Sequence, residues 1–224
     1  MAPIIVSFDG NIGSGKSSIV HYFEKNFDKF CNKKGKNYNI CFLQEPVSIW
    51  ESIKDENGKN VIEKFYENNE RYSFAFQMMA YISRLSLFKE ALSKDYDIIF
   101  TERSMYTDRH VFAKMLYDSK KMEYIEYQIY LKWFDEFAEV IKDIKTVYIK
   151  TSPVICDARV KKRNRSGENI PLNYLIDCHK YHEYWLQNKK ILVIDGNIDI
   201  LQTNETIENT YYDLVMEKVF TFIV

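Results

Sequence analysis

The sequence opens with an apolar run that leads directly into a glycine-rich loop. Residues 3–8 have the composition of a buried strand, and residues 10–17 show the pattern G-x-x-x-x-G-K-S ahead of helical periodicity. Strand, loop and helix in this order predict a phosphate-binding loop, whose backbone N–H groups form a concave nest at a helix N-terminus. Lys16 would add a mobile charge and Ser17 a magnesium ligand. The residues expected around the phosphates are Gly10, Asn11, Ile12, Gly13, Ser14, Gly15, Lys16, Ser17 and Ser18.

The composition indicates a single α/β domain spanning residues 1–224. Hydrophobic residues make up 46% of the chain, which is enough for a sizeable core. No apolar run reaches the about 18 residues of a membrane span, and a net charge of -1 gives no reason to expect nucleic acid as a partner. The four cysteines lack C-x-x-C spacing, and no signal segment precedes the first strand. We therefore expect a cytoplasmic protein with reduced thiols that binds neither membrane nor nucleic acid.

Acidic residues are expected at the carboxyl ends of two further strands. The apolar run 40–43 ends before Glu45, and the run 96–101 ends before Glu102 and Arg103. Ligands of open α/β sheets bind beyond the carboxyl ends of the strands, where the phosphate loop also lies. Glu45 is thus a candidate base near the transferred phosphate, the alternative being a solvated loop carboxylate. Glu102 is suited to hold magnesium and Arg103 to neutralise phosphate charge.

Residues 70–92 contain neither glycine nor proline and keep helical periodicity, which predicts a long, largely buried helix. One edge of this helix combines an amide, a small residue, a cation and aromatic rings. Such an edge suits a nucleobase, because an amide can bond a base edge in both directions and aromatic faces can stack on the ring. The alternative is an ordinary amphipathic boundary. The residues on this edge are Gln77, Ala80, Tyr81, Arg84 and Phe88.

A basic segment follows Pro153, where another helix is expected to begin. Arg159 and Arg163 lie four residues apart on one helical face, and Arg165 follows. A run of this kind is often only a solvated face. Beside a phosphate loop it also fits a lid, over about residues 159–170, that closes on ATP and excludes water. The remaining patterns predict helices over 124–141 and 205–220 and strands over 146–149 and 191–194.

Six separated motifs occur in the order found in one enzyme family. They are Gly-Asn-Ile-Gly-Ser-Gly-Lys-Ser at 10–17, Glu45-Pro46-Val47 with Trp50, Phe76-Gln77, Glu102-Arg103-Ser104, Arg163-x-Arg165 ahead of Ile170-Pro171-Leu172, and His179-x-x-His182-Glu183-x-Trp185. The chain resembles the deoxyribonucleoside kinases over nearly its whole length. The resemblance implies the P-loop kinase fold, with a five-stranded parallel sheet, helices on both faces and an arginine-rich lid. It also implies a homodimer packed through helices.

The same resemblance assigns roles to individual side chains. Glu45 would be the base for the sugar 5'-hydroxyl, Gln77 would pair with the nucleobase, and Tyr66 and Glu168 would hold the 3'-hydroxyl. Arg103 would position the reacting groups, with Trp50 beside the substrate. The γ-phosphoryl group of ATP would move to the sugar hydroxyl, with charge neutralised by Mg2+ and cations. The expected magnesium ligands are Ser17 and Glu102. The expected lid arginines are Arg159, Arg163 and Arg165.

The presumed base pocket resembles that of the kinases acting on deoxycytidine, deoxyguanosine and deoxyadenosine. It combines Gln77, Ala80, Arg84 and Asp108. An ionised Asp108 can accept a hydrogen bond from an exocyclic amino group, or from an Arg84 that in turn faces the base. Thymine has no such amino group, so we expect thymidine to be a poorer substrate.

Other functions fit part of the pattern. A nucleoside monophosphate kinase resembling thymidylate kinase would share loop and lid, but its acceptor phosphate needs cations where this chain offers Glu45 and Gln77. A nucleotide-gated binding module would need only the loop. The chain lacks the Asn-Lys-x-Asp motif of GTPases. His179 and His182 are spaced i, i+3, which is weak evidence for a metal site.

Overall fold

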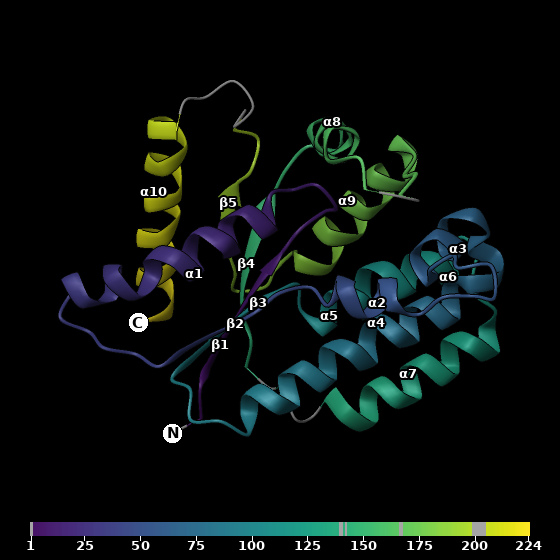
Figure 1. The fold of residues 1–224 in the computed structure, drawn as a ribbon, viewed down its shortest axis with the longest axis horizontal. Coiled ribbons are helices and arrows are strands. Elements are labelled where there is room, and N and C mark those ends of the chain that lie inside the picture. The colour runs from purple at the N-terminus through teal and green to yellow at the C-terminus, as the bar shows by residue number, and fades with distance from the viewer. Residues whose placement is uncertain (1, 139–140, 142, 166–167, 199–204) are drawn as a thin grey trace.

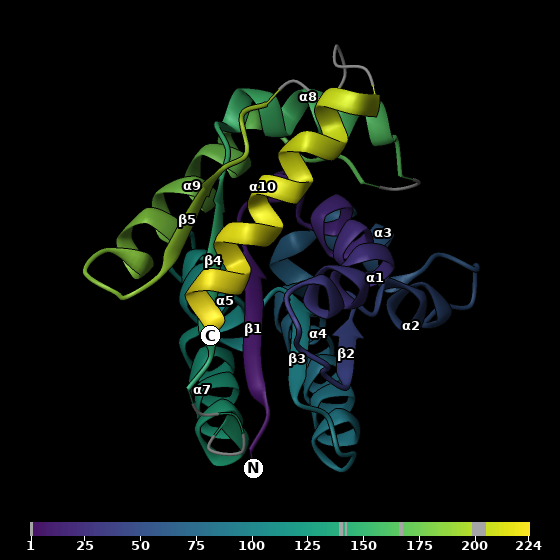
Figure 2. The same cartoon turned by 90° about the vertical axis from the view of Figure 1, so that its left-hand side faces the viewer.

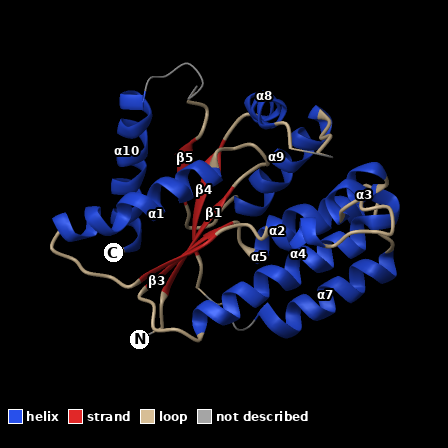
Figure 3. Ribbon diagram, viewed as in Figure 1, coloured by secondary structure: helices blue, strands red, loops and turns tan. Residues whose placement is uncertain are grey.

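Short runs rich in isoleucine, valine and phenylalanine form the strands of a central sheet. The computed structural model describes residues 2–138, 141, 143–165, 168–198 and 205–224, the side chains of 205–208 excepted. Five parallel strands pair in the order β2-β3-β1-β4-β5 (Figure 3). The predicted fold class is therefore confirmed. The strands are β1 (Ile4–Asp9), β2 (Ile40–Leu43), β3 (Ile98–Glu102), β4 (Lys145–Lys150) and β5 (Leu192–Asp195).

Helices connect these strands, as parallel pairing requires. Local chemistry sets several of their ends: Asn60 and Glu63 form a reciprocal capping box, and the Ser152 side chain caps a helix that has Pro153 in its first turn. The helices are α1 (Lys16–Lys33), α2 (Val47–Ser52), α3 (Val61–Glu67), α4 (Asn69–Leu92), α5 (Met105–Thr107), α6 (Lys114–Asp118), α7 (Tyr124–Ala138), α8 (Pro153–Arg163), α9 (Leu172–Leu186) and α10 (Glu205–Ile223). Between α5 and α6 the helix widens into a π-helical turn, η1 (Asp108–Ala113).

Alternate residues of the sheet bury against different helices. Val6 and Phe8 of β1 point into a core shared with α1 and α10. Ile5 points into a second core, with α4 and α7. Figure 1 shows the sheet between these two helix pairs, and α9 packs against β4 through the stacked rings of His182 and Tyr148. The sheet is thus covered on both faces, which explains why its strands read as apolar runs.

The loop after β1 lies at the middle of the sheet, beyond the carboxyl end of the central strand. Because β1 pairs with β3 and β4, its carboxyl end lies beside theirs. Figure 2 shows α8 and α9 on this side of the sheet, with α2 and α3 opposite them. The strands ending in Asp9 and Glu102 therefore deliver the phosphate loop and an acidic residue to the same place.

Some sequence-based expectations were wrong or fall partly outside the described residues. The helix predicted over 124–141 ends at Ala138, and residues 139–140 are not described. Residues 166–167, within the expected lid, are not described either. The long helix α4 is less buried than its periodicity suggests, since Ile82 is 44% exposed. Among the described residues, we find no helix with the length and hydropathy needed to cross a membrane.

Candidate active site

The phosphate loop adopts a conformation that its glycines make possible. Gly13 and Gly15 have left-handed φ angles of 76° and 98°, which residues with a Cβ rarely adopt. A Cβ on Gly13 would also lie 2.6 Å from the carbonyl oxygen of Cys156. The Lys16 ammonium donates to loop carbonyls, at 3.1 Å for Gly10 and 2.7 Å for Asn11. Burial, and then the nearby Arg103, lowers the pKa of Lys16 to about 8.

Three of the nine predicted loop residues support the loop from behind. The Asn11 side chain donates to the Leu175 carbonyl of α9 at 2.8 Å and accepts from the Ile12 amide. Ser14 is almost fully buried, and its carbonyl accepts from Thr151. Neither they nor Gly10 line the cavity described below. Asn11, Ser14 and Gly10 therefore shape the loop through side-chain and backbone contacts. The residues facing the cavity are Ile12, Gly13, Gly15, Lys16, Ser17 and Ser18.

The two predicted magnesium ligands are in contact. The Ser17 hydroxyl, in the first turn of α1, donates to Oε1 of Glu102 at 2.6 Å. Hydroxyl and carboxylate oxygens are the ligands that Mg2+ prefers, and this ion usually keeps several waters and binds phosphate oxygens as well. The described residues hold no cluster of three or more acidic, histidine or cysteine side chains able to bind a metal ion. The Ser17 hydroxyl and the Glu102 carboxylate thus fit a nucleotide-bound Mg2+.

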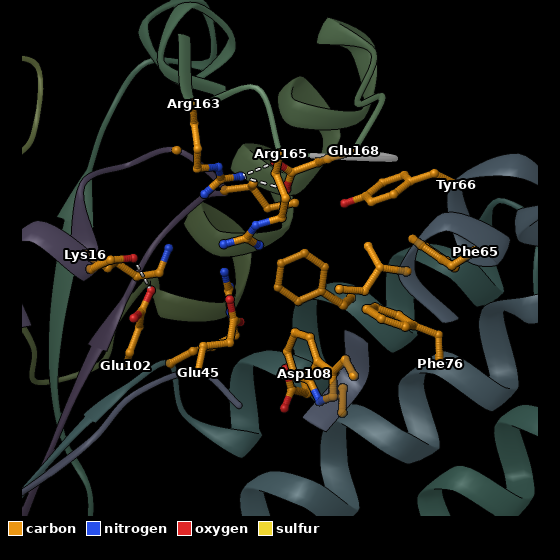
Figure 4. Close-up of a pocket in the computed structure, with 18 of the residues that line it drawn as sticks. Lys16, Glu45, Phe65, Tyr66, Phe76, Glu102, Asp108, Arg163, Arg165 and Glu168 are labelled. Carbon is orange, nitrogen blue, oxygen red and sulfur yellow. Dashed lines mark hydrogen bonds and ion pairs between the residues drawn. The ribbon is translucent and has the colours of Figure 1, made fainter. Parts of the chain in front are cut away.

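A single cavity of about 490 Å³ joins the phosphate loop to the helical side of the molecule (Figure 4). All nine predicted substrate-contacting residues line it, as do the three predicted lid arginines. Residues from the loop after β2 and from α4, β3, η1 and α8, far apart in the chain, are brought together there. The predicted substrate residues are Glu45, Trp50, Tyr66, Gln77, Ala80, Arg84, Arg103, Asp108 and Glu168.

Four charged side chains form a network on the cavity floor. The Arg84 guanidinium contacts Oε1 of Glu45 at 2.5 Å, Oδ2 of Asp108 at 2.9 Å and the Glu102 carbonyl at 3.1 Å. Arg103 reaches the same Glu45 oxygen at 3.4 Å. Burial disfavours the charged form of Glu45, but the surrounding cations, including Lys16, outweigh it and lower its pKa to about 2. The carboxylate predicted as a base is therefore held ionised.

Asp108 occupies the far end of this network. Of the two partners predicted for it, the structure pairs it with Arg84. Burial raises the pKa of Asp108 to about 6 in spite of Arg84 and Arg103. Its position depends on η1, because this π-helical turn carries both Asp108 and Phe112 to the cavity wall.

The wall of the cavity around Gln77 is amide and aromatic. Gln77 is 3% exposed, and its side-chain oxygen has no hydrogen-bond partner among the described residues. A buried unpaired amide oxygen costs free energy, so a ligand donor would stabilise it. Phe65 and Phe76 stack at 4.6 Å between ring centroids, and Trp50 packs edge-on against Phe76. The aromatic residues predicted for this role, Tyr81 and Phe88, do not line it.

Tyr81 and Phe88 are instead in the core between α4, α7 and the sheet. The Tyr81 hydroxyl donates to the Trp133 carbonyl of α7 at 3.1 Å. Their helical spacing from Gln77 places them on an adjoining face that α7 covers. The prediction that they stack on a base was therefore wrong.

The upper rim of the cavity carries the arginine cluster. Arg163 pairs with both carboxylate oxygens of Glu168, at 2.6 and 2.5 Å. Arg159 donates to the Ser14 carbonyl at 3.2 Å, and so reaches the back of the phosphate loop. Figure 4 shows Arg165 directed into the cavity. Burial and the negative charge of Glu168 raise the pKa of Tyr66 well above its usual value. The arginines of this rim therefore line the cavity, while Arg163 is also exposed to solvent.

Comparison with known proteins shows what kind of enzyme has this site. A sequence model of the family described as deoxynucleoside kinase matches residues 6–224. The chain belongs to the deoxynucleoside kinase family. It is an ATP-dependent nucleoside kinase, and the resemblance found from its motifs is confirmed.

Relatives of this kinase cover most of its length. Human deoxycytidine kinase is 33% identical, with 97% of this chain and 90% of the relative aligned. A probable deoxycytidine kinase of fowlpox virus is 31% identical over 95% and 88% of the two chains. The mitochondrial thymidine kinase 2 of Macaca fascicularis is 28% identical over 91% and 72%. The kinase thus has similar relatives whose names give different nucleosides.

Part of the cavity could not be foreseen from side-chain chemistry. Phe112 and Tyr174 are apolar or aromatic residues in helical patterns, which usually indicate core. Their exposure to a cavity depends on neighbours from other elements. Phe76 was noted only within a family motif. The lining residues missed as site residues are Ile62, Phe65, Phe76, Phe112, Lys162 and Tyr174.

Proposed function

We propose that this kinase transfers the γ-phosphoryl group of ATP to the 5'-hydroxyl of deoxyribonucleosides in nucleotide salvage, with deoxycytidine and purine deoxynucleosides preferred over thymidine. The observation that carries the proposal is the Glu45–Arg84–Asp108 chain of ion pairs. It spans the cavity floor between the phosphate loop and the aromatic wall. The phosphoryl donor would lie at one end of this chain and a base at the other, with Glu45 between them.

Phosphoryl transfer needs alignment and charge neutralisation more than covalent chemistry. Lys16 and the lid arginines would neutralise the donor phosphates, and Arg103 would orient the acceptor. Ser17 and Glu102 would hold Mg2+, which supplies charge neutralisation at the phosphates when bound. Glu45, held ionised by its arginines, would accept the proton of the sugar hydroxyl. Tyr66 and Glu168 would bond the 3'-hydroxyl.

The preferred bases follow from the donors and acceptors at the far end. Asp108 carries an acceptor beside Arg84, and the Gln77 amide can both donate and accept. An exocyclic amino group on cytosine or adenine would satisfy the carboxylate. Thymine would place a carbonyl and a methyl group there, leaving buried polar groups poorly paired at about 1–3 kcal/mol, or roughly ten- to hundredfold in kcat/KM. Relatives named deoxycytidine kinase agree with this preference.

The proposal is tested by ATP consumption with each of the four deoxynucleosides and with their 5'-monophosphates. We expect deoxycytidine to stimulate ATP consumption. In competition among the four nucleosides, thymidine should have the lowest kcat/KM. Stimulation by monophosphates alone would identify a nucleoside monophosphate kinase. ATP turnover independent of any acceptor would indicate a nucleotide-gated module.

Arg163 provides a separate test of the lid. Arg163→Ala should lower kcat/KM for ATP about tenfold or more, because a positioned arginine neutralises charge that develops during transfer. The matched control is Lys161→Ala, which removes an exposed cation of the same helix that pairs with Asp157 outside the cavity. If both variants have the same steady-state kinetics, the arginine cluster is an ordinary solvated face and not a lid.

The proposed quaternary structure is a homodimer packed through α4 and α7. These helices lie side by side (Figure 1), and their outer surface exposes Ile82, Ile125, Ile129 and Trp133 to solvent. Ile125, Ile129 and Trp133 recur every fourth residue, so they share one face of α7. Light scattering should give twice the chain mass, and Trp133→Glu should give a monomer. A monomeric wild-type protein would contradict the proposal.

A further inference from the structure

Asp9, the last residue of β1, has a buried carboxylate that bonds only to the protein itself. It is 0% exposed and does not line the cavity. Its Oδ2 accepts from the Ser7 hydroxyl at 2.6 Å. Its Oδ1 accepts from the Ser104 amide at 2.9 Å, the Ser104 hydroxyl at 3.2 Å and the Thr107 hydroxyl. Most of these donors belong to the turn after β3, so Asp9 joins the end of one strand to the turn that follows another.

That turn contains a residue in an unusual backbone conformation. Arg103 has a φ of 70°, in the left-handed region that residues with a Cβ seldom occupy. Such a conformation persists only where surrounding contacts hold it. The Arg103 amide donates to the Phe8 carbonyl at 3.0 Å, and its carbonyl accepts from the Thr101 hydroxyl at 3.1 Å. The next amide, that of Ser104, is held by Asp9.

The left-handed turn determines where the Arg103 side chain lies. Its guanidinium contacts Glu45 at 3.4 Å, donates to the Gly10 carbonyl at 3.3 Å and lies 4.6 Å from the ring centre of Phe112. It therefore joins the proposed base, the phosphate loop and the acceptor wall. A relaxed φ at Arg103 would move this side chain away from all three.

We infer that Asp9 is a positioning residue that acts through Arg103. Its carboxylate bonds the Ser104 amide and the two hydroxyls of the turn, and thereby holds Arg103 in the conformation that directs its guanidinium to Glu45. The inference rests on the role proposed above for Arg103 in orienting the acceptor. Asp9, the residue before the phosphate loop, thus serves the acceptor side of the site without contact to the substrate.

The first test compares two replacements of Asp9. Asp9→Ala removes every acceptor, and kcat should fall roughly 10- to 100-fold through misplacement of a group that orients the acceptor, with both KM values within about threefold. Asp9→Asn keeps Oδ1 for Ser104 and Thr107 and can donate to the Ser7 hydroxyl, so kcat should stay within about fivefold. Ser7→Ala, which removes the bond on the oxygen away from the turn, is the control, with kcat within about threefold.

The second test places the same changes in an Arg103→Ala background. If Asp9 acts through Arg103, Asp9→Ala should lower kcat by less than about twofold there, while its effect on melting temperature persists. If Asp9→Ala does not fold, Thr107→Val removes one bond to the carboxylate and takes its place in the cycle. An equal effect on kcat in both backgrounds would overturn the inference and leave the kinase proposal standing. An Arg103→Ala enzyme with unchanged kcat would overturn both the inference and the role proposed for Arg103.

Discussion

Replacing Glu45 by glutamine should lower turnover at least ~100-fold, the lower end of the range for loss of a general base. Glutamine keeps the shape of the side chain but cannot accept the proton of the sugar hydroxyl. Nucleoside affinity should largely survive, because Gln77, Tyr66 and the aromatic wall are unchanged. The measurement is single-turnover phosphoryl transfer, together with nucleoside binding and the melting temperature of each variant.

The low pKa of Glu45 predicts the direction in which activity depends on pH. The cations around Glu45 hold its pKa at about 2, so the carboxylate is ionised throughout the usual assay range. It becomes protonated, and activity that depends on it is lost, only as the pH falls toward that value. Loss of wild-type activity above about pH 4 would therefore have to come from another group. Glu45→Asp keeps the charge but moves it back by the length of one methylene group. Its turnover should lie between those of wild type and Glu45→Gln. Turnover of Glu45→Gln near the wild-type rate would show that Glu45 is not the base.

Replacing Arg84 by methionine together with Asp108 by alanine should raise the thymidine to deoxycytidine ratio of kcat/KM about tenfold or more, through removal of the polar corner. Asp108 is replaced together with Arg84, because both side chains are 4% exposed and removal of Arg84 alone would leave a buried carboxylate without its partner at about 3–5 kcal/mol. The assay is competition among the four deoxynucleosides at equal concentration.

The control for this double variant is an ion pair of the same chemistry outside the cavity. Glu90 and Lys94, on the last turn of α4 and just beyond it, pair at 2.7 Å and are exposed. Replacing them by alanine and methionine should leave the base preference unchanged. If wild-type enzyme already prefers thymidine, or if the Arg84 and Asp108 variant keeps its preference for deoxycytidine, the proposed base recognition is wrong while the kinase activity stands.

Features set by adjacent residues could be predicted from the sequence. The phosphate loop is one, because its glycines determine the available φ angles and its helix supplies the N–H groups. The strands are another, since a short apolar run can bury both faces only inside a covered sheet. Glu45 and Glu102 were placed in the site for the related reason that all parallel strands direct their carboxyl ends to one edge.

Features set by packing between distant elements could not be predicted in the same way. Helical periodicity correctly indicated a long helix over residues 70–92, but it does not say what covers each face of α4. The fold places α7 over Tyr81 and Phe88 and leaves Gln77 facing the cavity. For the same reason the position of Phe65, Phe76 and Phe112 on the cavity wall could not be predicted from the sequence.

The phosphate loop, the parallel α/β fold and the membership of the chain in a kinase family could all be predicted, because each depends on local geometry or on motifs in a fixed order. The pairing of the charges could be seen only once the elements were packed together. Arg84 of α4 bonds Glu45 and Asp108 from two other segments, and Asp9 bonds Ser104 ninety-five residues later. Such pairs depend on angles and distances of a few ångström between separate elements, and no spacing along the chain encodes these directly.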